Sequence, residues 1–127
     1  MIKMKIVENK ILPFGHYTAM TLGKFIFTKD ASKITEKVQQ HEAIHYCQQA
    51  ELAYIIFFIM YFLSFVTQFI RCAFIKNLGR VENGNNSLWS RSYRTVLFER
   101  EAYLHEDEPE YLENRIPYCW FLLNFYI

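Results

Sequence analysis

The chain has 127 residues, a formal net charge of +1 and 18% aromatic residues. This length suits one domain with a modest core, and the near-neutral charge argues against a nucleic-acid-binding protein. The three cysteines lie far apart without CxxC spacing, which argues against a disulfide framework and favours a reducing compartment. We therefore interpret residues 1–127 as a single domain.

The N-terminal part of the chain predicts a small sheet. Residues 1–12 alternate apolar and charged side chains, as a half-buried strand does. Phe14–Met20 is predicted as a second strand, and Lys24–Thr28, rich in aromatic and branched residues, as a third. We expect residues 1–30 to form an antiparallel β-meander whose edge can pair with an extended peptide. The first residues lack the apolar core of a signal peptide.

Residues 31–76 predict two successive helices. Asp30 and Ser32 are good N-cap residues, so the first helix is expected from about residue 32 to at least Leu52. Residues 52–70 are almost uninterruptedly apolar and long enough to span a bilayer. Two interpretations remain open, a membrane helix and the buried central helix of a small soluble protein. If the segment spans a membrane, the basic residues after it place its C-terminal side in the cytoplasm: Arg71, Lys76, Arg80, Arg91 and Arg94.

The first of these helices contains the pattern HExxH, from His41 to His45. Residues four apart lie on the same face of a helix, so the two imidazoles can bind one tetrahedral zinc ion. Glu42 follows the first ligand, where it can take a proton from a zinc-bound water. The helix can lie in a core beside the metal, because the neighbours of the motif carry no charge: Val38, Gln39, Ala43, Ile44, Tyr46 and Cys47.

The C-terminal part begins with a loop. Asn77–Ser87 is rich in Gly and Asn, which is typical of turns. Residues 87–127 are predicted to contain a further helix, which carries a third metal ligand, and an aromatic tail from Tyr118 that packs on the domain or on lipid. The acidic stretch Glu106–Glu110 is expected to be a solvated helix terminus.

A catalytic zinc ion usually has three protein ligands and one position for water. The third ligand is expected from Glu99 or Glu101, which lie on the predicted downstream helix. Residues two apart point to nearly opposite sides of a helix, so only one of the two carboxylates can bind the metal. His105 and His16 are further alternatives.

The stretch Glu99-Arg100-Glu101-Ala102-Tyr103 resembles the ExEAD element of gluzincin metallopeptidases, which include the HtpX-type and CAAX prenyl protease families. This resemblance implies that Glu99 is the third zinc ligand. Together with Tyr17–Gly23 and HEAIH, it also resembles a group of short, uncharacterised Bacteroidetes-type proteins. Tyr103 stands where the larger families carry an Asp that supports a zinc-binding histidine. Tyr103 itself, Glu101 or a backbone carbonyl is expected to replace it.

We expect an α+β, minimal zincin-like fold and a zinc metallopeptidase that acts on peptides or unfolded protein segments. Its metal ligands are His41, His45 and Glu99, and Glu42 is the general base. Of four candidate oxyanion donors we favour Tyr93, over Arg94, Tyr103 and His105. Glu51 is either a support of the site or an ordinary helix carboxylate. The alternatives are a non-catalytic zinc-binding or membrane-associated interaction protein and a membrane protein with an incidental motif. The location is expected to be cytoplasmic or at the inner membrane.

Overall fold

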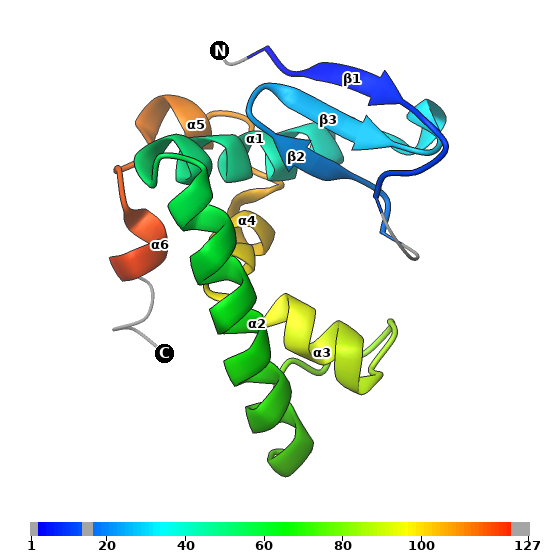
Figure 1. The fold of residues 1–127 in the computed structure, drawn as a ribbon, viewed down its shortest axis with the longest axis vertical. Coiled ribbons are helices and arrows are strands. Elements are labelled where there is room, and N and C mark those ends of the chain that lie inside the picture. Colours follow the sequence, from blue (N-terminus) through cyan, green and yellow to red (C-terminus); the bar gives the residue numbers. More distant parts are fainter. Residues whose placement is uncertain (1–2, 14–16, 123–127) are drawn as a thin grey trace.

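The computed structural model describes residues 3–13 and 17–122. A three-stranded sheet precedes a set of helices, so the predicted α+β class is confirmed (Figure 1). The strands are β1 (Lys5–Glu8), β2 (Met20–Leu22) and β3 (Phe25–Thr28). The helices are η1 (Ala31–Lys33), α1 (Glu36–Glu51), α2 (Ile55–Phe74), α3 (Leu88–Arg94), α4 (Leu97–His105), α5 (Tyr111–Asn114) and α6 (Cys119–Leu122).

The sheet is mixed, so the prediction of an antiparallel meander is wrong for its first strand. β2 and β3 form an antiparallel hairpin, in which Gly23 has a φ of 59°. β1 instead pairs in parallel with the other side of β3, with Ile6 opposite Ile26. The Asn9 side chain accepts hydrogen bonds from the backbone of residues 11 and 12, which turns the chain away before a hairpin can form. Of the predicted second strand, residues 14–16 lie outside the described part, and the observed strand begins at Met20.

α1 begins later than expected because two caps share its N-terminal region. Asp30 caps the short helix η1, and its side chain accepts a hydrogen bond from Ser32 N. Thr35 caps α1 through a hydrogen bond from Val38 N. α1 then passes between the sheet and α4, with β2 on one side and α4 on the other (Figure 1). This position buries the HExxH motif.

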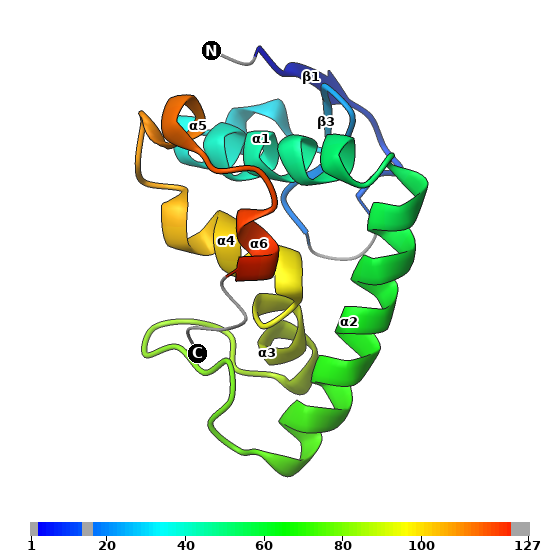
Figure 2. The same cartoon turned by 90° about the vertical axis from the view of Figure 1, so that its left-hand side faces the viewer.

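A sharp bend separates α1 from α2. Ala53 and Tyr54 have φ angles of 52° and 61°, a region that residues other than glycine rarely adopt. Tyr54 N donates to Gln49 O at 2.8 Å, which closes the end of α1 in the manner of a Schellman motif. The bend sends α2 along the side of the molecule, with α3 against its C-terminal half (Figure 2).

α2 is attached to the domain along one stripe. Only Phe57 and Cys72 are buried within it, and Phe57 joins a core cluster with Val96, Phe98 and Trp120. The predicted aromatic tail therefore packs on the domain through Trp120, although residues 123–127 lie outside the described part.

Buried Arg91 fastens the C-terminal end of α2. Its guanidinium donates to Cys72 O, Ile75 O and Leu78 O. Arg91, one of the basic residues predicted to follow a membrane span, is therefore buried and stabilises the fold. Arg94 also binds inward, to Gly79 O.

Candidate metal centre

Three side chains from α1 and α4 converge at one point. His41 Nε2 lies 2.9 Å and His45 Nε2 3.1 Å from the same oxygen, Oε1 of Glu99. The ligand atoms all lie within 4.8 Å of one another, and the three residues are at most 7% exposed. The predicted ligand set is therefore brought together, and the group could hold a metal ion.

The other nitrogen of each imidazole has its own acceptor. His41 Nδ1 lies 2.6 Å from a Glu106 carboxylate oxygen, and His45 Nδ1 lies 2.8 Å from Gln48 Oε1. The orientation of the Gln48 amide follows from its own contacts, because its Nε2 donates to Phe98 O and to a Glu101 oxygen. Each Nδ1 therefore carries hydrogen, and each Nε2 presents its lone pair to the centre of the group.

Two lone pairs and a carboxylate oxygen repel one another unless a cation lies among them. Without a metal, protons fill this role. Burial lowers the pKa of His41, but hydrogen bonds to Glu106 and Glu99 outweigh it and raise the pKa to about 10. Burial raises the pKa of Glu99, yet the charge of His45 and the hydrogen bond from His41 hold it well below its usual range. The group therefore favours bound positive charge, which a metal ion could supply in place of protons.

Glu101 points away from the metal group and serves the fold. It is 0% exposed, and its carboxylate binds Arg115, with Arg115 Nε donating at 2.5 Å, and also Tyr111, whose hydroxyl donates at 2.7 Å. Glu51 is paired with the same guanidinium at 2.7 and 3.0 Å and accepts a hydrogen bond from Trp120. Glu51 is thus a structural carboxylate that fixes the C-terminal segment, rather than a support of the metal ligands.

The two histidine alternatives for the third ligand do not enter the described group. His105 stacks on Tyr111 at a ring-centroid distance of 3.8 Å and pairs with Glu108. His16 lies outside the described residues. Among the described residues, Glu99 is the carboxylate that joins the two histidines.

No family model, curated protein or solved structure matches the chain. The likeness to gluzincins therefore depends on HExxH and on the placement of Glu99. The residue that supports His41 differs from our expectation. His41 is supported by Glu106, which is half-buried and not solvated as predicted, and Tyr103 meets the His41 ring edge-on at a centroid distance of 4.7 Å.

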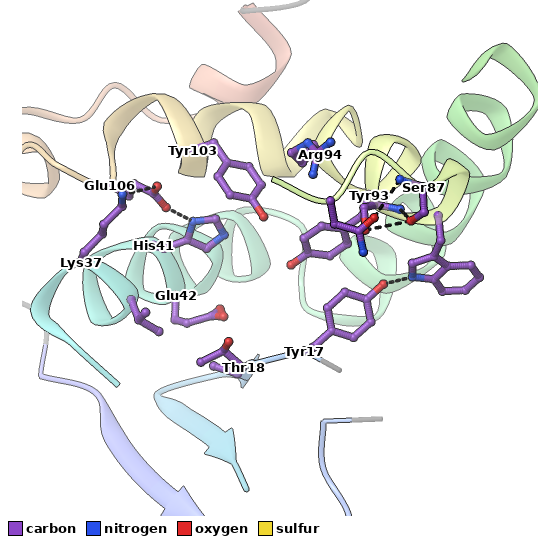
Figure 3. Close-up of a pocket in the computed structure, with 15 residues that line it drawn as sticks. Tyr17, Thr18, Lys37, His41, Glu42, Ser87, Tyr93, Arg94, Tyr103 and Glu106 are labelled. Carbon is purple, nitrogen blue, oxygen red and sulfur yellow. Dashed lines mark hydrogen bonds and ion pairs between the residues drawn. The ribbon is translucent and has the colours of Figure 1, made fainter. Parts of the chain in front are cut away.

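Glu42 lies beside the metal group at the wall of a cavity of ≈ 810 Å³ (Figure 3). Its side chain is 6% exposed, and Thr21 Oγ1 donates to its Oε2 at 2.6 Å. Figure 3 shows Tyr103 beside His41 and Glu42 near them, with Tyr93 on the other side of this cavity. The predicted general base is thus held by a buried hydroxyl and faces an accessible space.

Tyr93 stays protonated at neutral pH. Burial and the charges of Glu99 and Glu42 raise its pKa well above 10. The ring lies between Tyr17 and Tyr103, with centroid distances of 4.9 and 6.3 Å. A neutral hydroxyl in this position is a hydrogen-bond donor.

Sequence reasoning missed four residues that complete the centre. Tyr61 of α2 donates to Glu99 Oε2 at 2.6 Å, and Thr21, Gln48 and Glu106 hold Glu42, His45 and His41 respectively. One signal was available in the sequence. Tyr61 interrupts an apolar run with a hydroxyl that needs a partner when it is buried.

The edge of the sheet near the site is partly occupied. β2 is an edge strand, and Gln49 Nε2 donates to Thr21 O, while Gln49 Oε1 accepts from Gly23 N. The side chain of Gln49 thus takes the place of a neighbouring strand at these two residues. Thr18 and Ala19, just before β2, line the cavity instead.

Proposed function

We propose that this protein is a zinc-dependent metallopeptidase that hydrolyses peptide bonds in peptides or unfolded protein segments. The observation that carries the proposal is the buried group of His41, His45 and Glu99 with Glu42 beside it at a cavity. Two histidines and one glutamate are a ligand set of zinc hydrolases, which keep a further position for water or substrate.

Two of the three spacings between the ligand atoms are compatible with zinc. A tetrahedral zinc ion with bonds of about 2.0–2.1 Å holds its ligand atoms roughly 3.3 Å apart. The two histidine nitrogens lie 2.9 and 3.1 Å from the Glu99 oxygen, close to that value. Nitrogen and carboxylate donors in this ratio suit zinc better than calcium or magnesium, which prefer oxygen ligands alone.

In this proposal each residue of the chain has a defined task. Zinc, when bound, supplies a Lewis acid that polarises the substrate carbonyl and makes water more acidic. Glu42, held by Thr21, takes the proton of the attacking water and passes it to the leaving amine. The neutral hydroxyl of Tyr93 donates a hydrogen bond to the oxygen on which negative charge develops.

We also propose that the protein is associated with the cytoplasmic side of the inner membrane through α2. α2 has 20 residues and a mean hydropathy of 1.9 over its most apolar window, so it is long and apolar enough to cross a bilayer. Most of its side chains are exposed, including Ile55 (72%), Phe62 (65%) and Phe74 (84%). A central helix of a soluble protein would bury these side chains.

The test combines zinc content with activity. We expect about one zinc ion per chain in the wild type and its loss in His41→Ala and Glu99→Ala. Glu42→Gln keeps the three ligands, so we expect it to retain zinc and to lose peptidase activity by roughly 10²–10⁴-fold. Glu36→Gln, on an exposed part of α1, is the matched control and leaves both unchanged.

The outcomes separate the proposal from its alternatives. Zinc in the wild type without peptidase activity supports a non-catalytic zinc protein. No zinc after reconstitution leaves HExxH as an incidental motif and overturns the proposal.

A further inference from the structure

A second cavity, of ≈ 730 Å³, adjoins the metal group on the side of α2. It is a groove between α2 and a wall that includes Pro13, Met20 and Trp89. At one end it is lined by Glu42, His45 and Glu99. From here we call it the α2 groove, and its lining residues on α2 are Phe57, Phe58, Tyr61, Phe62, Phe65, Val66, Phe69 and Ile70.

The groove is too long for one amino-acid side chain. Its lining on α2 runs from Phe57 to Ile70, which at 1.5 Å per residue is about 20 Å. A single side chain fills only a fraction of that length. An extended chain of single bonds advances about 1.2 Å per bond, as in an extended polypeptide, so about sixteen carbons match the groove.

The groove is also unsuited to a peptide backbone, whose N–H and C=O groups need partners when they are buried. In the part of the chain that the structure describes, polar side chains of its wall are already engaged. Tyr61 donates to Glu99, and Trp89 Nε1 donates to the Tyr17 hydroxyl. Gln49 is held by β2. A hydrocarbon chain needs no such partners.

The two cavities meet at the proposed catalytic residues. Both are lined by Glu42 and Tyr93. The first cavity carries polar and charged groups at its wall, among them Lys37, Arg94 and Glu106. A molecule that fills both therefore has one apolar part and one part that can carry polar groups, with its reacting bond beside Glu42.

We propose that the substrate of this site is an amide whose acyl part is a hydrocarbon chain of about sixteen carbons, bound in the α2 groove, and whose amine part lies in the first cavity. This inference rests on the proposed hydrolytic function. Water adds its oxygen to the acyl carbon, and the C–N bond breaks. The amine leaves with the proton that Glu42 carried, so a fatty acid and a free amine are the products.

The groove opens towards the exposed face of α2. Phe62 and Ile70 line it and are 65% and 54% exposed. An acyl chain that is dissolved in a bilayer around α2 can thus enter sideways without crossing water. Entry from lipid avoids the cost of exposing the chain to water, because the chain stays in an apolar medium throughout.

Photolabelling tests chain binding without hydrolysis. The whole protein, in detergent micelles, is irradiated in the presence of hexadecanoic acid that carries a diazirine at its far end. The adducts are then mapped by mass spectrometry. We expect adducts on residues 65–70 and on Trp89, their loss with excess unlabelled hexadecanoic acid, and their persistence in Glu42→Gln. Adducts spread equally over the non-lining residues Ile59 and Leu63 would show a nonspecific apolar coat and overturn the proposal.

A matched pair of variants tests whether the acyl chain binds in the α2 groove. Val66→Trp fills the groove, whereas Leu63→Trp adds the same bulk on the exposed face of α2 outside the lining. We expect labelling to fall at least about tenfold in Val66→Trp only, while zinc content, which reports an intact fold, stays unchanged in both. Equal labelling of the two variants contradicts the proposal.

A chain-length series tests the substrate class. The zinc-loaded protein is given one peptide acylated with acetyl, octanoyl, dodecanoyl or hexadecanoyl groups, and release of the acid is measured. We expect kcat/KM to rise by up to about fourfold per added CH₂ group. Cleavage within the peptide at equal rates for all four would overturn this inference and leave the peptidase proposal intact. Labelling of the α2 groove without hydrolysis of any of these substrates would support binding of the acyl chain and contradict the proposed hydrolytic function.

Discussion

The interface of α1 with α4 and the surface of α2 depart from the usual distribution of side chains in opposite ways. At the interface, charged and polar residues are buried, and Glu99 and Glu101 are 2% and 0% exposed. On α2, large apolar residues are exposed, with Phe62 at 65% and Leu63 at 58%. Both arrangements cost free energy unless something else compensates for them.

The compensation differs between the two regions. The interface is completed partly from within, because Arg115 pairs with Glu101 and Glu51, and the histidine group could hold a metal ion. In the described part of the chain, no other element covers the exposed surface of α2, and the proposals above assign it to an apolar medium and an apolar ligand. Functional sites are the places where this kind of inversion is expected.

The largest expected effect comes from removing the positive partner of the carboxylates at the interface of α1 with α4. Arg115→Ala leaves buried Glu101 and partly buried Glu51 without a positive partner, so we expect the free energy of unfolding to fall by about 3–5 kcal/mol. Urea denaturation measures it. Arg80→Ala, at an exposed position, is the control and changes stability by about 0.5 kcal/mol or less. Equal losses in both variants would contradict the role of the ion pair.

The next effect tests the medium around α2. Leu63 lies near the centre of α2, and Leu63→Lys places a charge on the exposed apolar face that is proposed to meet the bilayer. We expect partitioning into liposomes to weaken by about 2.5–3.5 kcal/mol, or roughly 100-fold. Asn83→Lys adds the same charge at an exposed loop position and serves as the control. Unchanged flotation of Leu63→Lys with liposomes would remove the membrane from the proposal.

The sequence predicted the features that depend on local spacing. The α+β class follows from alternating strand patterns and apolar helical segments, and the helix around HExxH and the pairing of its two histidines follow from the helical period. The choice of Glu99 over Glu101 came from a resemblance, and the burial of Glu101 beside Arg115 gives its physical reason.

Features that depend on distant contacts, or on local turns without a clear residue signal, could not be predicted. The parallel pairing of β1 follows from the turn at Asn9, and the bend at Ala53 and Tyr54 lacks a glycine or proline signal. Glu106 looked like part of a solvated acidic turn. Only the packing of α4 on α1 brings it to His41, which is 65 positions earlier in the chain.

A smaller effect distinguishes the two kinds of support around the histidines. Glu106 accepts the hydrogen bond from His41 Nδ1, which fixes the ring and keeps its Nε2 lone pair free. We therefore expect Glu106→Ala to weaken zinc binding by about 10–100-fold, measured by competition with a chromophoric chelator. The control is Glu108→Ala, because Glu108 pairs with His105 outside the metal group. Loss of affinity in the control but not in Glu106→Ala would contradict this assignment.

The smallest effect is expected at Tyr103, which occupies the position of the supporting Asp in the gluzincin pattern. Its ring meets the His41 ring edge-on, while its hydroxyl points into the cavity (Figure 3). Tyr103→Phe keeps the ring contact, so zinc affinity should change by about 0.5 kcal/mol or less, in the same chelator assay. A loss as large as that of Glu106→Ala would mean that the hydroxyl, and not Glu106, orients His41. The buried metal group would then be supported by a residue at the cavity and not only by residues within the α1–α4 interface. The interface would in that case depend on its exposed side, as the surface of α2 does.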